Sequence, residues 1–199
     1  VARDLGRSFL ERDLLDKRNH QNESKRKKAK EVIAGLLQCT VDDVRGVQLD
    51  KYLLYQEQGG KCLYSGEELD LLSVLRDAHV CEVDHIVPYS LILDNTLQNK
   101  ALVLAGENQQ KRQRTPLMYL AGVRRENFVA RINAMYTRKE NALSQKKYQY
   151  LMMPSLYGDE AEEILDTWKS RNINDTRYIT KYVLNYLKHN LKFAGESKV

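Results

Sequence analysis

The stretch from Cys81 to Lys111 limits most strongly what this chain can fold into. It begins with a short β-branched run from Cys81 to Val87, which Pro88 stops because proline has no N–H to donate within a strand. A polar loop follows, and a second apolar run at about residues 100–104 ends at Gly106. The pattern therefore predicts a strand, a loop, a second strand and then a helix.

Most of the remaining chain is predicted to be helical, since apolar residues recur at helical spacing in several segments. A helical turn is expected at residues 69–75, and a short strand with a turn at residues 61–66. The fold class is accordingly α+β and predominantly helical. The predicted helices cover residues 1–38, 49–58, 126–135, 143–153, 159–170 and 175–191, and the helix after the second strand runs up to Thr115-Pro116.

Composition narrows the class of protein. Hydrophobic residues make up 42% of the 199, which excludes wholesale disorder, and the net charge of +5 fits a nucleic-acid partner without requiring one. The three cysteines form no C-x-x-C pair, so neither a disulfide framework nor a cysteine-rich zinc ribbon is expected. We expect a reducing, cytoplasmic location instead. No apolar run approaches the ~18 residues of a membrane span. Because the chain begins without Met, we expect it to be a piece of something longer.

The side chains of the central segment suit hydrolysis of a phosphodiester, which needs an activated water and a cation beside the phosphate. Asp84 and Asn108 offer the oxygen ligands that Mg²⁺ prefers, and so few protein ligands leave room for waters and phosphate oxygens. His85 is the candidate general base, since a histidine side chain is in good part neutral near pH 7. Neighbouring residues on a strand point to opposite faces, so Asp84 and His85 can serve one site only where the strand ends.

Asn99 and Lys111 are given secondary roles. Asn99 is assigned to holding the loop between the strands, because an asparagine side chain readily bonds backbone groups. Lys111 lies one helical turn beyond Asn108 and either contacts a phosphate or is a solvated lysine, and the sequence favours neither. Taken alone, Asp84-His85 would be read as a surface dipeptide; its occurrence together with both asparagines favours a site.

Six segments form a set of motifs: Lys61–Gly66, Glu82–Ser90, Asp94–Thr96, Asn99–Leu104, Glu107–Lys111 and Thr115-Pro116. Together they resemble one known family, the HNH nuclease domain of the RNA-guided type II CRISPR effectors. Residues 2–5 are similar to the helix that leaves the preceding RuvC segment of these effectors, and residues 171–179 to the linker that returns to it. The stretch from Asn174 to Tyr178 is similar to the compact subgroup of the family.

This resemblance implies a ββα-metal core, in which a small two-stranded antiparallel sheet is surrounded by helices. It implies that His85 is the general base, that Asp84 and Asn108 bind Mg²⁺, for which Mn²⁺ is expected to substitute, and that Asn99 is a structural residue of the motif. Asn108 stands where the third letter of the HNH motif calls for histidine, as is usual for these effectors.

Domain organisation and partners are also implied by the resemblance. The expected domains are a helical linker at residues 1–48, the nuclease domain at 49–170 and a second helical linker at 171–199. The expected partners are a target DNA strand paired to a guide RNA and, in the same polypeptide, RuvC and a recognition lobe. No membrane partner is expected, and the location is a prokaryotic cytoplasm. Two alternatives remain open, a free-standing HNH endonuclease and a non-catalytic module that docks on nucleic acid.

Overall fold

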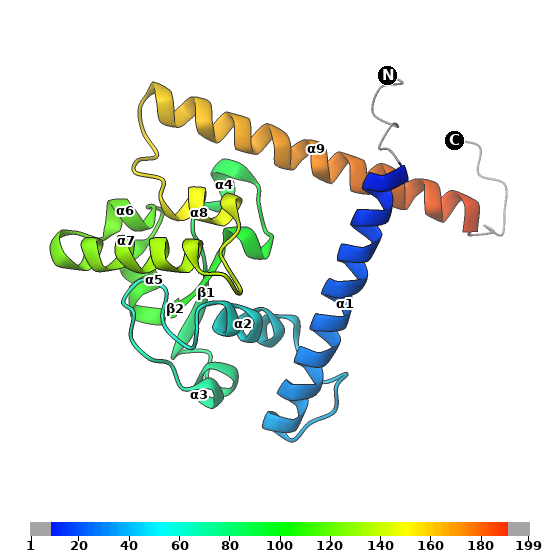
Figure 1. Ribbon diagram of the computed structural model, residues 1–199, viewed down its shortest axis with the longest axis horizontal. Helices are drawn as coiled ribbons and strands as arrows, with labels where there is room; N and C mark the ends of the chain where they lie inside the picture. The colour runs from blue at the N-terminus through cyan, green and yellow to red at the C-terminus, as the bar shows by residue number, and fades with distance from the viewer. Residues whose placement is uncertain (1–8, 191–199) are drawn as a thin grey trace. The chain divides into compact units, whose positions relative to one another are not determined.

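The computed structural model describes residues 9–190, and Figure 1 shows the order of its elements. Within α1 (Phe9–Leu37) and α9 (Asp159–Asn190) some side chains are not described, namely those of residues 9–12, 15, 18, 174–179, 181, 182, 185, 186 and 188–190. Residues 2–5 and the side chains of 174–179, which carry part of the resemblance, lie outside the described residues. No helix within the described part is long and apolar enough to cross a membrane.

The central segment has the predicted order of elements. β1 (Cys81–His85) and β2 (Lys100–Leu104) form a two-stranded antiparallel sheet, and α5 (Ala105–Lys111) follows directly. β1 ends two residues before the predicted Val87, and beyond it Ile86 N donates to Asn99 O at 3.0 Å. The expectation of a small antiparallel sheet among helices is confirmed.

The other elements are short except for α7, and most lie close to their predicted positions. In place of the strand predicted at 61–66 there is a single bridge from Lys61 to Glu68. The remaining elements are α2 (Gly46–Glu57), α3 (Leu71–Arg76), α4 (Tyr89–Ile92), η2 (Leu97–Asn99), α6 (Pro116–Tyr119), α7 (Gly122–Thr137) and α8 (Gln145–Leu151).

Two of the predicted helix boundaries are wrong. α9 runs without a break through residues 171–174, where the sequence indicated a gap between two helices. The stretch contains neither proline nor glycine, so a continuous helix is permitted there, and tertiary contacts such as the bond from Asn172 to Ile92 favour it. The helix after β2 ends at Lys111 instead of continuing to Thr115. Thr115 begins a new helix, α6, since its side chain accepts a hydrogen bond from Met118 N as an N-cap.

The chain divides into two compact units. The first contains residues up to 84 together with 101–110, and the second contains residues 85–100 together with those from 111 onward. In the first unit the end of α1 packs with α2 and α3 around an apolar cluster that includes Ile33, Leu49 and Leu75. Burial of these side chains is the main stabilising contribution to this arrangement of helices.

Gln58 completes the sheet of the first unit. Its side-chain nitrogen donates to Leu102 O at 2.8 Å, and its side-chain oxygen accepts from Leu102 N at 2.8 Å. Leu63 N also donates to Leu102 O, at 3.1 Å. These contacts supply β2 with hydrogen-bond partners that a third strand would otherwise provide.

In the second unit α4 packs against α9, and α8 packs against both α7 and η2 (Figure 1). Phe128 and Ile132 from α7 and Tyr150 from α8 are fully buried. Tyr150 also meets Trp168 of α9 edge-on, with ring centroids 4.7 Å apart. Helices that come much later in the chain thus pack against parts of the segment between β1 and β2.

Candidate active site

His85 is the last residue of β1, and both its backbone and its ring have defined partners in the second unit. The ring nitrogen Nε2 lies 3.1 Å from Oδ1 of Asn95. The imidazole packs beside Tyr89 with centroids 5.7 Å apart. Lys111 Nζ donates to the backbone oxygen of His85 at 2.8 Å. The imidazole of a partly exposed residue is thus fixed from two sides while remaining open to solvent.

Lys111 was expected either to contact a phosphate or to be solvated. Its side chain is 1% exposed, so the solvated alternative is wrong. Burial of a lysine requires hydrogen-bond partners for the ammonium, and the His85 carbonyl is one of them. The phosphate contact itself stays a prediction.

Asn99 is fully buried in the loop between the strands. Its Oδ1 accepts from Val87 N at 2.9 Å, and its Nδ2 donates to Val87 O at 2.9 Å and to Asp94 O at 3.0 Å. Both ends of the amide are therefore bonded to main-chain groups on the two sides of the loop. The Asn99 side chain thus supplies these main-chain groups with the hydrogen bonds that another backbone segment would otherwise make.

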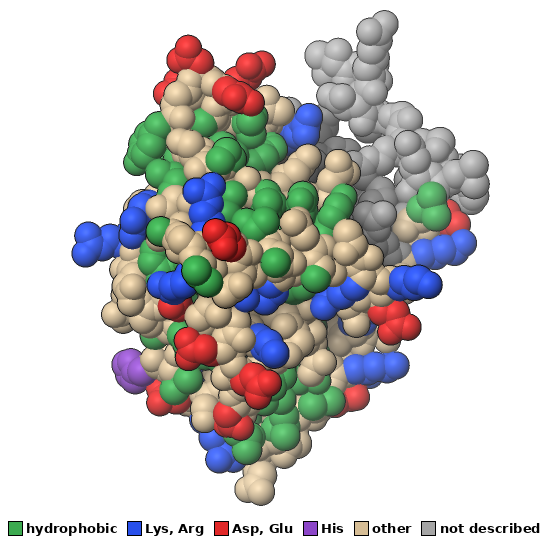
Figure 2. Space-filling model, turned by 60° about the vertical axis from the view of Figure 1, so that its left-hand side comes forward, with side chains coloured by type: hydrophobic (Ala, Val, Ile, Leu, Met, Phe, Trp, Pro, Cys, Tyr) green, Lys and Arg blue, Asp and Glu red, His purple; other side chains and the backbone are tan. Residues whose placement is uncertain are grey.

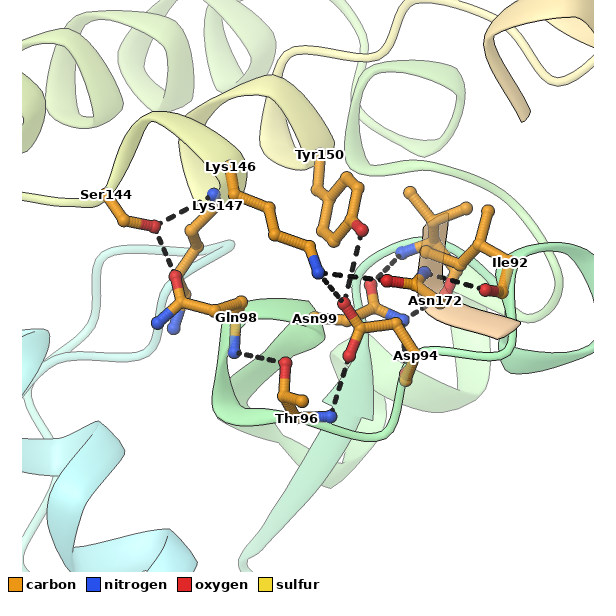
Figure 3. Close-up of polar contacts among 11 residues, drawn as sticks. Ile92, Asp94, Thr96, Gln98, Asn99, Ser144, Lys146, Lys147, Tyr150 and Asn172 are labelled. Carbon is orange, nitrogen blue, oxygen red and sulfur yellow. Dashed lines mark hydrogen bonds and ion pairs between the residues drawn. The ribbon is translucent and has the colours of Figure 1, made fainter. Parts of the chain in front are cut away.

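Asp94 forms the centre of a polar cluster that Figure 3 shows. Its Oδ2 accepts from Lys146 Nζ at 2.8 Å and from the hydroxyl of Tyr150 at 3.2 Å, while its Oδ1 accepts from Thr96 N at 2.8 Å. Burial would raise the pKa of Asp94, but the hydrogen bonds from Lys146 and Thr96 outweigh it and hold this pKa below its ordinary value. The cluster is therefore built around an ionised carboxylate.

Two further bonds connect this cluster to α9 (Figure 3). Lys146 Nζ donates to Oδ1 of Asn172 at 3.1 Å, and Asn172 Nδ2 donates to Ile92 O at 2.8 Å. Burial lowers the pKa of Lys146, yet the bond to Asp94 and its negative charge raise it overall. Lys146 and Asn172, which come from two later helices, thus hold the loop at Asp94 and Ile92.

Asp84 lies in the first unit and is 7% exposed. Its Oδ2 accepts a hydrogen bond from the hydroxyl of Tyr64 at 2.5 Å. Burial raises the pKa of Tyr64 well above its usual range, and the charge of Asp84 raises it further. Tyr64 therefore remains a protonated donor at neutral pH, and it holds the Asp84 carboxylate in one orientation.

Asn108, on α5 in the first unit, is oriented by Glu82. Its Nδ2 donates to Oε2 of Glu82 at 2.5 Å, which turns the amide oxygen away from that carboxylate. A cavity of about 360 Å³ is lined by Asn108 and Glu82 together with the cations Arg45, Lys51 and Arg76. Asn108 therefore lies beside a hollow whose lining contains both charged and apolar side chains.

The donor set of Asp84 and Asn108 fits Mg²⁺ better than zinc. One carboxylate and one amide oxygen are hard ligands, and a hard cation that keeps several waters needs few of them. Across the described residues, no three His, Cys, Asp or Glu side chains gather where they could hold a metal ion, so a closed zinc site is not present there.

The predicted site residues fall in both units. Asp84 and Asn108 belong to the first, and His85, Asn99 and Lys111 to the second. The sequence reasoning missed the residues that orient them. Tyr64, Glu82 and Asn95 lie inside the motifs Lys61–Gly66, Glu82–Ser90 and Asp94–Thr96, so each had a local signal, whereas Lys146 and Asn172 lie on helices outside these motifs and had none. Tyr64, Glu82 and Asn95 contact Asp84, Asn108 and His85 directly, whereas Lys146 and Asn172 contact the loop at Asp94 and Ile92.

Comparison with known proteins gives consistent results. Residues 62–117 match the family model described as HNH endonuclease. Over 145 residues the chain is 35% identical to CRISPR-associated endonuclease Cas9 1 of Streptococcus thermophilus, an alignment that covers 71% of this chain and 12% of that protein. It is 34% identical over 147 residues to CRISPR-associated endonuclease Cas9 of Staphylococcus aureus, covering 70% of this chain and 13% of that protein.

A solved structure supports the same relationship over more of the chain. The crystal structure of Streptococcus thermophilus Cas9 in complex with AGGA PAM matches with a TM-score of 0.64 at 26% identity, and it covers 92% of this chain and 18% of that one. The chain thus spans 12% and 13% of the length of the two curated relatives. It is homologous to the HNH region of the Cas9 endonucleases, and it carries an endonuclease domain of the HNH family.

Proposed function

We propose that this chain is the Mg²⁺-dependent nuclease domain that cuts the DNA strand paired to a guide RNA in a type II CRISPR effector. The observation that carries the proposal is the occurrence of Asp84, His85 and Asn108 within a region homologous to the HNH region of Cas9. The orientation of Asn108 by Glu82 and of Asp84 by Tyr64 supports it, because both ligands have a defined direction before any cation binds.

In this mechanism the side chains act on one water molecule and one phosphodiester. His85 accepts a proton as the water oxygen attacks phosphorus, and the P–O bond to the departing alkoxide breaks. Asp84 and Asn108 would hold the cation. When bound, Mg²⁺ neutralises charge on the phosphate and stabilises the departing oxygen.

Asn99 is assigned a structural role, which its burial and its bonds to Val87 and Asp94 support. Removal of its amide would leave main-chain groups of the loop without partners in a buried place. A contact between Lys111 and a phosphate remains part of the proposal as well. For that contact the ammonium would have to leave or share its bond to His85 O.

The proposed nucleic-acid partner is a guide RNA–DNA heteroduplex, read through its backbone geometry. On the face that Figure 2 shows, acidic side chains gather at the top, and over the rest of the face Lys and Arg side chains are interspersed with Asp and Glu. A net charge of +5 with this mixed distribution suits contacts within a larger complex, where base pairing supplies specificity. RuvC and the recognition lobe are proposed as partners in the same polypeptide, because the chain spans so little of its relatives.

A reducing, cytoplasmic location is proposed as well. Cys39, Cys62 and Cys81 are all free thiols. Burial raises the pKa of Cys81 to about 11, so this thiol is protonated and unreactive at neutral pH.

The test is Mg²⁺-dependent cleavage by the effector that contains this chain, with each DNA strand labelled separately. We expect His85→Ala to lower cleavage of the guide-paired strand by about 10²–10⁴-fold, the usual contribution of a general base. Asn127→Ala, at an exposed position of α7, is the matched control and should cut normally. If His85→Ala still cut the guide-paired strand at the normal rate, the proposal would be wrong.

A further inference from the structure

We propose that Asn95 is a positioning residue for His85. Its side-chain oxygen accepts a hydrogen bond from Nε2–H, which leaves Nδ1 as the nitrogen that takes the proton from water. The inference rests on the proposed role of His85 as general base, and it adds which nitrogen acts and which residue selects it.

The contact points to the proton position, with the Asn95 amide oriented so that its oxygen faces His85. Oδ1 of Asn95 lies 3.1 Å from Nε2 of His85, within hydrogen-bond range. A carbonyl oxygen can only accept, so Nε2 must carry the hydrogen. A neutral imidazole has a single N–H, and Nδ1 is then left with its lone pair. A base that must accept a proton needs this lone pair directed at the water and not at a protein donor.

The backbone at His85 is held, and Tyr89 lies beside the ring. Lys111 Nζ donates to the His85 carbonyl at 2.8 Å, and the next residue, Ile86, donates its N–H to Asn99 O at 3.0 Å. The ring also packs beside Tyr89, with 46° between the ring planes. With the backbone and one side of the ring held, the bond to Asn95 fixes the remaining rotation of the imidazole.

Asn95 itself is exposed, so core packing does not direct its side chain. Its position is set by its two neighbours, because Thr96 N donates to Oδ1 of Asp94 at 2.8 Å and closes a turn around residue 95. Asp94 is held in turn by Lys146 and by the amide of Asn99 (Figure 3). Helix α8 and the buried asparagine thus hold the loop that presents Asn95 to His85.

The direct test is the tautomer of His85, read from the ¹⁵N shifts of its two ring nitrogens in the labelled chain at alkaline pH, where the imidazole is neutral. In the wild type we expect Nε2 in the protonated range and Nδ1 in the unprotonated range. Asn95→Ala should give a mixture of both tautomers. Asn95→Asp keeps an oxygen acceptor and should restore the wild-type pattern, and the exposed control Asn127→Ala should not alter it.

Two results would overturn the inference. One is a wild-type spectrum with the proton on Nδ1, as expected if the Asn95 amide were reversed and donated to Nε2. The other is a tautomer ratio that Asn95→Ala leaves unchanged.

A cleavage assay separates this inference from the proposed function. In the effector that contains this chain, Asn95→Ala should lower the rate of guide-paired strand cleavage about tenfold, and Asn95→Asp should recover part of the loss. If His85→Ala abolishes cleavage while Asn95→Ala leaves both rate and tautomer unchanged, the general base stands and the positioning role fails. If the tautomer depends on Asn95 but His85→Ala still cuts normally, the proposed function fails instead.

Discussion

Asp94→Ala is the substitution that tests most directly how the loop between β1 and β2 is held. Asp94 is 2% exposed, and its carboxylate accepts from Thr96 N, Tyr150 and Lys146. Hydrogen bonds to a charged group contribute about 1.5 kcal/mol each at the lower end of the measured range. The bonds from Thr96 N and from the Tyr150 hydroxyl therefore contribute about 3 kcal/mol together. The Lys146 side chain is 42% exposed, so solvent screens the ion pair and it adds at most about 1 kcal/mol.

The expected loss is therefore about 3–4 kcal/mol in the free energy of unfolding, which corresponds to a melting temperature lower by roughly 6–16 °C for a chain of this size. Urea unfolding followed by circular dichroism would measure it at neutral pH. Asp166→Ala is the matched control, since Asp166 is an exposed aspartate on α9 and its removal should change stability by less than about 0.5 kcal/mol.

The pH dependence provides the sharper check. Because the folded-state pKa of Asp94 lies below its ordinary value, its contribution is present above the unfolded pKa of about 3.9 and is lost as pH falls through the folded pKa. The stability difference between wild type and Asp94→Ala should thus shrink in acid below about pH 4. The reasoning would be refuted if the free energies of unfolding of wild type and Asp94→Ala differed by less than about 1 kcal/mol at neutral pH. It would also be refuted if this difference were the same at neutral pH and in acid below about pH 4.

Three further predictions concern other parts of the structure. Asp84→Ala and Asn108→Ala should raise the Mg²⁺ concentration needed for cleavage and be partly rescued by Mn²⁺; metal titrations that coincide with wild type would contradict the ligand assignment. Asn99→Ala should lower the melting temperature, since about 2–3 kcal/mol is lost when buried main-chain groups lose their partners, and an unchanged melting temperature would count against a structural role. Gln58→Ala should destabilise by about 2 kcal/mol through two lost bonds to β2, whereas the exposed Gln56→Ala should not.

The parts of the fold that could be predicted are those set by neighbouring residues. The order strand, loop, strand and helix follows from β-branched runs, a proline and a glycine, all within a short stretch, and the bounds of β2 were predicted correctly. The continuous helix α9 could not be predicted, because asparagines at 172 and 174 are weak helix formers and only tertiary contacts decide whether the helix continues. One of these contacts is the bond from Asn172 to Ile92, 80 residues away.

In the candidate site, too, features set by neighbouring residues could be predicted and contacts between distant residues could not. Asp84, His85, Asn99 and Asn108 could be proposed from the sequence because acidic, imidazole and amide groups at short spacing have few simultaneous explanations, and their roles stay predictions. The contacts that hold the loop at Asp94 could not be predicted, since the hydroxyl of Tyr150 is 56 residues from Asp94 and lies in a helix whose pattern indicates only packing.

The small sheet explains why so many of these partners are polar side chains. A two-stranded sheet is marginally stable in water, and each of its outer edges presents unpaired N–H and C=O groups. In the first unit the side chain of Gln58 and the backbone of Leu63 bond to β2 as an added strand would. In the second unit Asn99 bonds both backbone groups of Val87 directly after β1 ends. Amide side chains are suited to this work because each offers a donor and an acceptor in the geometry of a peptide group, and an apolar substitute of equal size would leave both backbone groups buried and unpaired.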